Sequence, residues 1–241
     1  MIWIRKIHKW ASVLVAIQFL LWLLSGLYFN LMDPVKAHGN SYRSKQQLAE
    51  KIDVSQLVAV KRILQQSPQA VNVKLISLVG KPYYLLNHKR GLYKHLSNQY
   101  SLINALTGEL VSMDSKMVNT LAQASYSGSG DITSTQLITA KISEFPKQKN
   151  PTWQINFNDA LSTSVYIEDK SGRIVGHSDD DKRLADIAFK LHFLDYGNVG
   201  GFNNMQNYIF AFLALWLSFT GIIWTIELAL KGRYKLRSRR K

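Results

Sequence analysis

Two long apolar stretches near the ends of the 241-residue chain constrain its fold more than any other feature. The segments from Trp10 to Met32 and from Tyr208 to Ile226 contain no charged residue. A helix of about twenty residues crosses the roughly 30 Å hydrocarbon core of a bilayer, because each residue adds about 1.5 Å. We therefore predict two transmembrane helices, at 10–32 and 208–230, which form a hairpin.

Basic residues stand at one flank of each apolar stretch. Three cations precede the first stretch within residues 1–9, and seven follow the second within residues 231–241. Lysine and arginine in short flanks stay in the cytoplasm, so both termini are predicted there. The first stretch is longer than a signal-peptide core and lacks a small-residue cleavage motif, so we expect it to remain uncleaved. We predict a two-pass protein of the bacterial inner (cytoplasmic) membrane, with its main domain in the periplasm.

The formal net charge of +14 does not indicate a nucleic-acid partner. Residues 33–207 contain 20 basic and 15 acidic side chains, so most of the excess lies at the two flanks. The lipid bilayer is therefore the expected partner of this charge, and no nucleic acid is expected. The chain has no cysteine, which excludes disulfides, thiol catalysis and cysteine-ligated metal sites.

The segment between the spans has the pattern of an α+β domain, in which we expect helices packed on antiparallel sheet. Hydrophobic periodicity, turn residues and a capping Asp114 predict helices at 55–66 and 114–126, and strands at 71–79, 83–87, 100–105, 153–157 and 164–168.

An amphipathic stretch precedes the second span. Its apolar stripe predicts a helix at the outer membrane interface, with Lys182, Arg183 and Lys190 in water. Asp179 to Asp181 are expected to cap this helix and face water. The predicted boundaries are periplasmic units at 33–113 and 114–181, and an interfacial helix and hinge at 182–207.

A weak internal repeat links the two predicted periplasmic units. Residues 103–112, INALTGELVS, align with residues 167–176, IEDKSGRIVG, at a constant offset of 64. Each copy reads as a strand, a Thr-Gly or Ser-Gly turn and a second strand. Duplication of one small unit explains the repeat.

This repeat and its flanks resemble a known family. Residues 151–157 (PTWQINF) and 166–176 (YIEDKSGRIVG) resemble a PepSY domain. Residues 5–10 (RKIHKW) and 183–192 resemble the PepSY-associated transmembrane family. The resemblance implies PepSY units built as a helix on a small antiparallel sheet. Some such relatives are implicated in ferric-siderophore reduction and carry b-type haem between membrane helices, and others are propeptide or inhibitory modules beside proteases.

Histidines are the candidate cofactor ligands. A b-type haem needs two axial imidazoles that face an apolar slot. His38 and His192 are both expected on the outer side and could meet there, whereas His8 lies on the cytoplasmic side and could meet its symmetry mate in a homodimer. The resemblance points to His8 and His192 as ligands of haem iron. These two lie at opposite faces, so they would not share one haem.

A structural role is the alternative for the same residues. His8 and His192 stand near Trp10 and Tyr196, and all four could anchor helix ends at the membrane surface. The remaining histidines, His88, His95 and His177, lie in polar contexts and are expected in water. Small residues in both spans would allow close helix approach, namely Ser25, Gly26, Ser218, Thr220 and Gly221.

Two functions are therefore open. In one, the hairpin, as a homodimer or with a membrane partner protein, holds haem b and moves electrons outward, with ferric iron as one acceptor. In the other, a membrane-tethered module without cofactor binds a peptide or protein through a sheet edge and regulates a protease or envelope complex. No catalytic triad, zinc-hydrolase motif or phosphate loop occurs, so no catalytic residue is predicted and enzymatic activity stays open.

Overall fold

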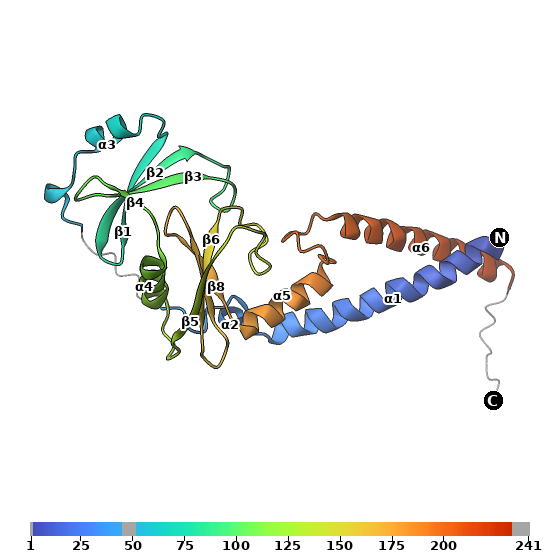
Figure 1. The fold of residues 1–241 in the computed structure, drawn as a ribbon. Coiled ribbons are helices and arrows are strands. Elements are labelled where there is room, and N and C mark those ends of the chain that lie inside the picture. The colour runs from blue at the N-terminus through green and yellow to red at the C-terminus, as the bar shows by residue number, and fades with distance from the viewer. Residues whose placement is uncertain (1, 45–51, 233–241) are drawn as a thin grey trace. The chain divides into compact units, whose positions relative to one another are not determined.

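The structure, a computed structural model, describes residues 2–44 and 52–232 (Figure 1). The chain divides into two compact units. The helical unit comprises Met1–Leu31 and Ala188–Lys241, and the sheet unit comprises Met32–Ile187. Of the predicted basic tail at 231–241, residues 233–241 lie outside the described residues.

The helical unit contains two long antiparallel helices, α1 (Ile2–Leu31) and α6 (Met205–Leu230). Both are long and apolar enough to cross a membrane, and most of their side chains are exposed. A core helix of a soluble protein would bury such side chains. The two predicted apolar helices are thus confirmed, although α1 begins well before Trp10.

The two helices meet along stripes whose residues are spaced alternately by three and four. All members of both stripes are buried or half-buried: His8, Ala11, Val15, Gln18, Trp22, Ser25 and Phe29 on α1, and Phe210, Leu213, Leu217, Thr220, Trp224 and Glu227 on α6. This spacing is typical of helices that pack at a small crossing angle. Polar side chains of the first span therefore face the second helix or its connections.

The sheet unit contains two four-stranded sheets, each with its strands in sequence order and all neighbours antiparallel. The first sheet comprises β1 (Asn72–Leu78), β2 (Lys81–Lys89), β3 (Gln99–Asn104) and β4 (Leu110–Val111). The second comprises β5 (Ile132–Ile138), β6 (Thr152–Phe157), β7 (Ser164–Glu168) and β8 (Ile174–Ser178). The predicted α+β class with antiparallel sheet is confirmed.

Helices cover the sheets. α3 (Val60–Gln66) buries Ile63 against Tyr84, Leu86 and Ile103 of the first sheet. α4 (Ser115–Ser125) buries Val118, Leu121 and Ala122 in a second core that includes residues of both sheets. Asp114 caps α4, as predicted, by accepting a hydrogen bond from the Met117 N–H at 2.8 Å.

The predicted helix at 55–66 is wrong in its first half. A short 3-10 helix, η1 (Val54–Gln56), is followed by an extended break before α3. The break occurs because Val58 pairs elsewhere: its N–H donates to the Ala105 carbonyl at 2.8 Å, and its carbonyl accepts from the Tyr84 hydroxyl. Strand β5 was not predicted, because an exposed edge strand needs no apolar alternation.

The charged end of α5 (Asp180–His192) also differs from expectation. Asp179 accepts a hydrogen bond from the Lys182 N–H at 2.8 Å, but it is fully buried rather than in water. Lys182 is 8% exposed, and its ammonium group bonds Asp186 at 2.5 Å and the Glu144 carbonyl at 3.1 Å. Asp179 and Lys182 were expected in water, and this expectation is wrong, because both side chains are buried within the sheet unit. Earlier in the chain, the short helix α2 (Pro34–Ala37) follows α1, with Asp33 as its N-cap.

Candidate functional site

His8 lies on the buried stripe of α1 and contacts α6. Its Nδ1 is 2.8 Å from Oγ1 of Thr220. The ring packs beside Trp216 and Trp224, with centroid distances of 6.2 and 5.8 Å. A Cβ on Gly221 would stand 3.7 Å from the Cε1 atom of His8, so the ring lies against this glycine.

The hydroxyl of Thr220 determines the tautomer of His8. Its single hydrogen donates within α6, to the Trp216 carbonyl at 2.9 Å. With its hydrogen assigned to that carbonyl, the oxygen accepts from the Nδ1–H of His8, and we assign the imidazole this tautomer. The Nε2 atom of the neutral imidazole then keeps its lone pair.

His192, the last residue of α5, has the same arrangement against α1. Its Nδ1 is 2.9 Å from Oγ of Ser25, which donates to the Leu21 carbonyl at 2.6 Å. A Cβ on Gly26 would stand 3.8 Å from Cε1 of His192. The ring packs between Phe29 and Phe193, with centroid distances of 5.2 and 4.9 Å. His192 thus also carries its proton on Nδ1.

The two histidines are therefore held by equivalent hydroxyl–glycine pairs, Ser25-Gly26 and Thr220-Gly221. In each pair the hydroxyl fixes the ring nitrogen and the glycine gives the ring room. His8 and Ser25 are seventeen residues apart on α1, or about 25 Å of helix. The two sites are therefore separate.

Side chains of α1 also hold the backbone around His192. The Gln18 amide donates to the Leu191 carbonyl at 2.8 Å, and the Trp22 indole donates to the His192 carbonyl at 2.5 Å. Tyr196 in turn donates to Gln18 at 2.8 Å. The last carbonyls of a helix have no intrahelical partner, and in an apolar environment they need one. These bonds fix the end of α5 against α1.

Both Nε2 atoms remain available. Within residues 2–44 and 52–232, neither accepts or donates a hydrogen bond, and neither is among the fully buried unpaired atoms. Charged side chains stand close to both histidines in the sequence: Lys6 and Lys9 flank His8, and Lys190 and Asp195 flank His192.

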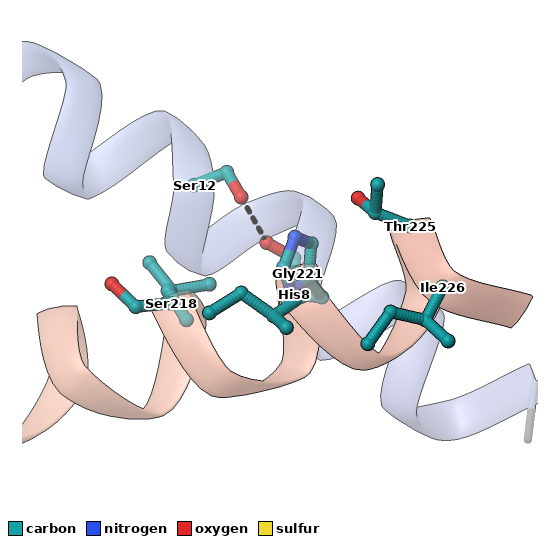
Figure 2. Close-up of a pocket in the computed structure, with 8 residues that line it drawn as sticks. His8, Ser12, Ser218, Gly221, Thr225 and Ile226 are labelled. Atoms are coloured by element: carbon teal, nitrogen blue, oxygen red, sulfur yellow. Dashed lines mark hydrogen bonds between the residues drawn. The ribbon is translucent and has the colours of Figure 1, made fainter. Parts of the chain in front are cut away.

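A groove of about 590 Å³ opens beside His8 (Figure 2). Small side chains contribute much of its lining, and the residues involved are His8, Ser12, Leu217, Ser218, Gly221, Ile222, Thr225 and Ile226. The groove places an accessible space next to the imidazole ring.

These residues fit an axial position of b-type haem. An axial histidine binds iron through one nitrogen while the other donates a hydrogen bond that fixes the ring, and aromatic surroundings keep the site apolar. His8 and His192 each meet these conditions. The described residues contain no group of three or more histidine, cysteine or acidic side chains placed to hold a metal ion.

The other histidines all belong to the sheet unit. His38 is exposed, and its Nδ1–H donates to the Pro34 carbonyl at 2.5 Å. Its pairing with His192 stays a prediction. The expectation that His177 lies in water is wrong: it is 1% exposed on β8, its Nε2 is 3.1 Å from the Ser125 hydroxyl, and burial lowers its pKa to about 4.

The last two histidines of the sheet unit are His88 and His95. His88 is half-buried on β2, with Nε2 2.8 Å from the Ser101 hydroxyl, and so it is also less solvated than expected. His95 stacks on Tyr93, with a centroid distance of 5.5 Å.

Sequence reasoning noted Ser25 and Thr220 only as small residues and did not assign Gln18 or Trp22 a partner. The available signal was the spacing of Gln18, Trp22 and Ser25, which are four and then three residues apart within one apolar segment.

Comparison with known proteins returns no relative: no family model, no curated protein and no solved structure matches the chain.

Proposed function

We propose that this protein is a two-pass electron carrier of the bacterial inner membrane, with b-type haem ligated by His8 and His192. The observation that carries the proposal is the shared hydrogen-bond geometry at Nδ1 of the two histidines. At both sites a hydroxyl that already donates within its own helix accepts from Nδ1, which leaves Nε2 as the free ligand atom.

The residues of the chain have distinct roles in this proposal. Haem, when bound, supplies one-electron chemistry. Ser25 and Thr220 hold the imidazoles in orientation, Gly26 and Gly221 leave space for the rings, and Trp22 and Gln18 hold the end of α5 in place. An interfacial anchoring role alone would not need two matched hydroxyl–glycine pairs.

The placement of the two sites supports transfer across the bilayer. His8 lies beside the basic N-terminal flank and His192 lies toward the other end of α1, about 25 Å of helix away. With the basic flanks in the cytoplasm, electrons would pass from the His8 site to the His192 site. The sheet unit, as a duplicated PepSY-type module in the periplasm, would receive the acceptor, of which ferric iron is one candidate.

A second candidate function is supported by the sheet unit. An apolar groove of about 390 Å³ lies beside the edge strand β1 and is lined by Val54, Leu57, Val58, Ala59, Val60, Val73, Leu75 and Tyr84. A peptide could extend the sheet at β1 and place an apolar side chain there. A photoreactive residue at Leu75 should then crosslink one protein in membranes, and Val60→Lys should abolish that product.

Electron transfer is tested in sealed proteoliposomes that contain ferricyanide and are exposed to external dithionite. The full chain, loaded with haem, should bleach the trapped ferricyanide. His8→Ala and His192→Ala should each abolish the rate, because one site serves each face, whereas His95→Ala should retain it. Equal rates for all four proteins would exclude the proposal.

A further inference from the structure

We propose that a second copy of this chain completes both haem sites, so that each haem lies between the same histidine of two hairpins. This inference rests on the proposed function, because it assigns the second axial ligand at the same two sites.

Within the helical unit, each site has only one imidazole of its own. The sequence places no histidine other than His8 and His192 in the helical unit, and these two are about 25 Å apart along α1. A bis-imidazole haem therefore needs a ligand from outside each site. A two-fold axis along the membrane normal pairs every residue with its own equivalent at the same depth, and so it supplies His8 to His8 and His192 to His192.

The surface beside His8 is suited to a second hairpin. Ser12, Ser218, Gly221 and Thr225 line the groove there, and Ser218 and Thr225 are exposed (Figure 2). Small residues at such spacing let membrane helices approach closely. Lipid chains would fill the same space but offer no partner for the Nε2 atom of His8.

Both sites adjoin the same flank of α1. Ser12 lines the His8 groove, and Gly26 lies against the ring of His192. The two residues are fourteen positions apart, and at about 100° per residue they differ by only about 40° around the helix. One axis on that flank can therefore serve both histidines.

The natural absence of cysteine makes this face directly testable in native membranes. Single substitutions Ser12→Cys and Ser218→Cys should give a crosslinked product with the mass of two chains on oxidation. Leu24→Cys is the control, because Leu24 is exposed but lies two residues before Gly26 and so about 200° around α1 from it. Equal crosslinking at Leu24 would overturn the proposal, as would a product that contains a different protein.

A second measurement separates this inference from the function on which it rests. In detergent, the wild type should have the mass of two chains and about one haem per chain. Ser218→Trp should give single chains without haem, and Leu24→Trp should behave as wild type. A single wild-type chain that retains haem would overturn the second-copy proposal and leave the electron carrier intact. A haem-free wild type from haem-supplied cells would overturn both.

Discussion

Single hydroxyl groups orient the two histidines of the helical unit, His8 and His192. Ser25 and Thr220 each use their hydrogen within their own helix, so each must accept from an imidazole. A hydrogen bond from Nδ1 makes the opposite nitrogen a more basic ligand and favours ferric iron. In the proposed haem protein the two hydroxyls are therefore positioning residues, and their effect would be measured in the reduction potential.

Removal of either hydroxyl should raise the potential of one haem. Ser25→Ala should affect the haem at His192, and Thr220→Val the haem at His8, with the other unchanged. A hydrogen bond of about 1 kcal/mol corresponds to at most about 40 mV for one electron. Potentiometric titration of the full chain measures both components. A lowered potential, or an equal shift of both haems by one substitution, would contradict this assignment.

His177 makes the stability of the sheet unit depend on pH. Burial lowers its pKa to about 4 from an ordinary value of 6.5. The unfolded chain therefore binds a proton between these pH values while the folded chain does not, so stability is full above about pH 6.5 and falls as the pH decreases. The loss approaches about 3 kcal/mol near pH 4.

The thermal midpoint of the full chain in detergent should thus fall between pH 7 and pH 5. His177→Gln should flatten this slope, and His95→Gln should not. Glu168 is also buried, but hydrogen bonds from Arg173 and Ser171 outweigh that burial and keep its pKa below the ordinary value of 4.5, so its contribution is lost only at lower pH. An unchanged slope in His177→Gln would assign the pH dependence to another group.

At the scale of elements, the parts that could be predicted are those with a local cause. The spans follow from length and apolarity, and α4 from its Asp114 cap and apolar face. Contacts between distant elements could not be predicted. The pairing of His8 with Thr220, which are 212 positions apart in the sequence, depends on the register of α1 against α6. The burial of His177 depends on contacts with Ser125 and Gly39, which are also remote in sequence.

Gly39 connects the turn after α2 to β8, and a side chain there has no space. Its φ is +70°, and an added Cβ would lie 2.5 Å from the His177 carbonyl oxygen, a backbone atom. Gly39→Ala should therefore destabilise the full chain by about 2 kcal/mol or more. Gly201→Ala is the matched control, because nothing lies within 4 Å of its added Cβ, and it should change stability by less than about 0.5 kcal/mol. Equal thermal midpoints for both variants would refute this role of Gly39.

At the scale of the whole molecule, two units with different surfaces share one chain. The helical unit exposes most of its apolar side chains, whereas the polar side chains of Gln18, Ser25 and Thr220 are buried or half-buried. The sheet unit buries its apolar residues in two cores of its own. This division is expected when lipid surrounds one unit and water the other. Of the candidate haem ligands, His8 and His192 lie in the helical unit and His38 lies in the sheet unit.

The haem content of the purified full chain tests the central claim most directly. It is measured from oxidised and dithionite-reduced absorbance spectra of wild type, His8→Ala and His192→Ala from haem-supplied cells. We expect a reduced b-type α-band in the wild type at about one haem per chain. Each variant should contain about half that amount of haem, because each histidine serves its own site. A colourless wild type, or variants with undiminished haem, would contradict it.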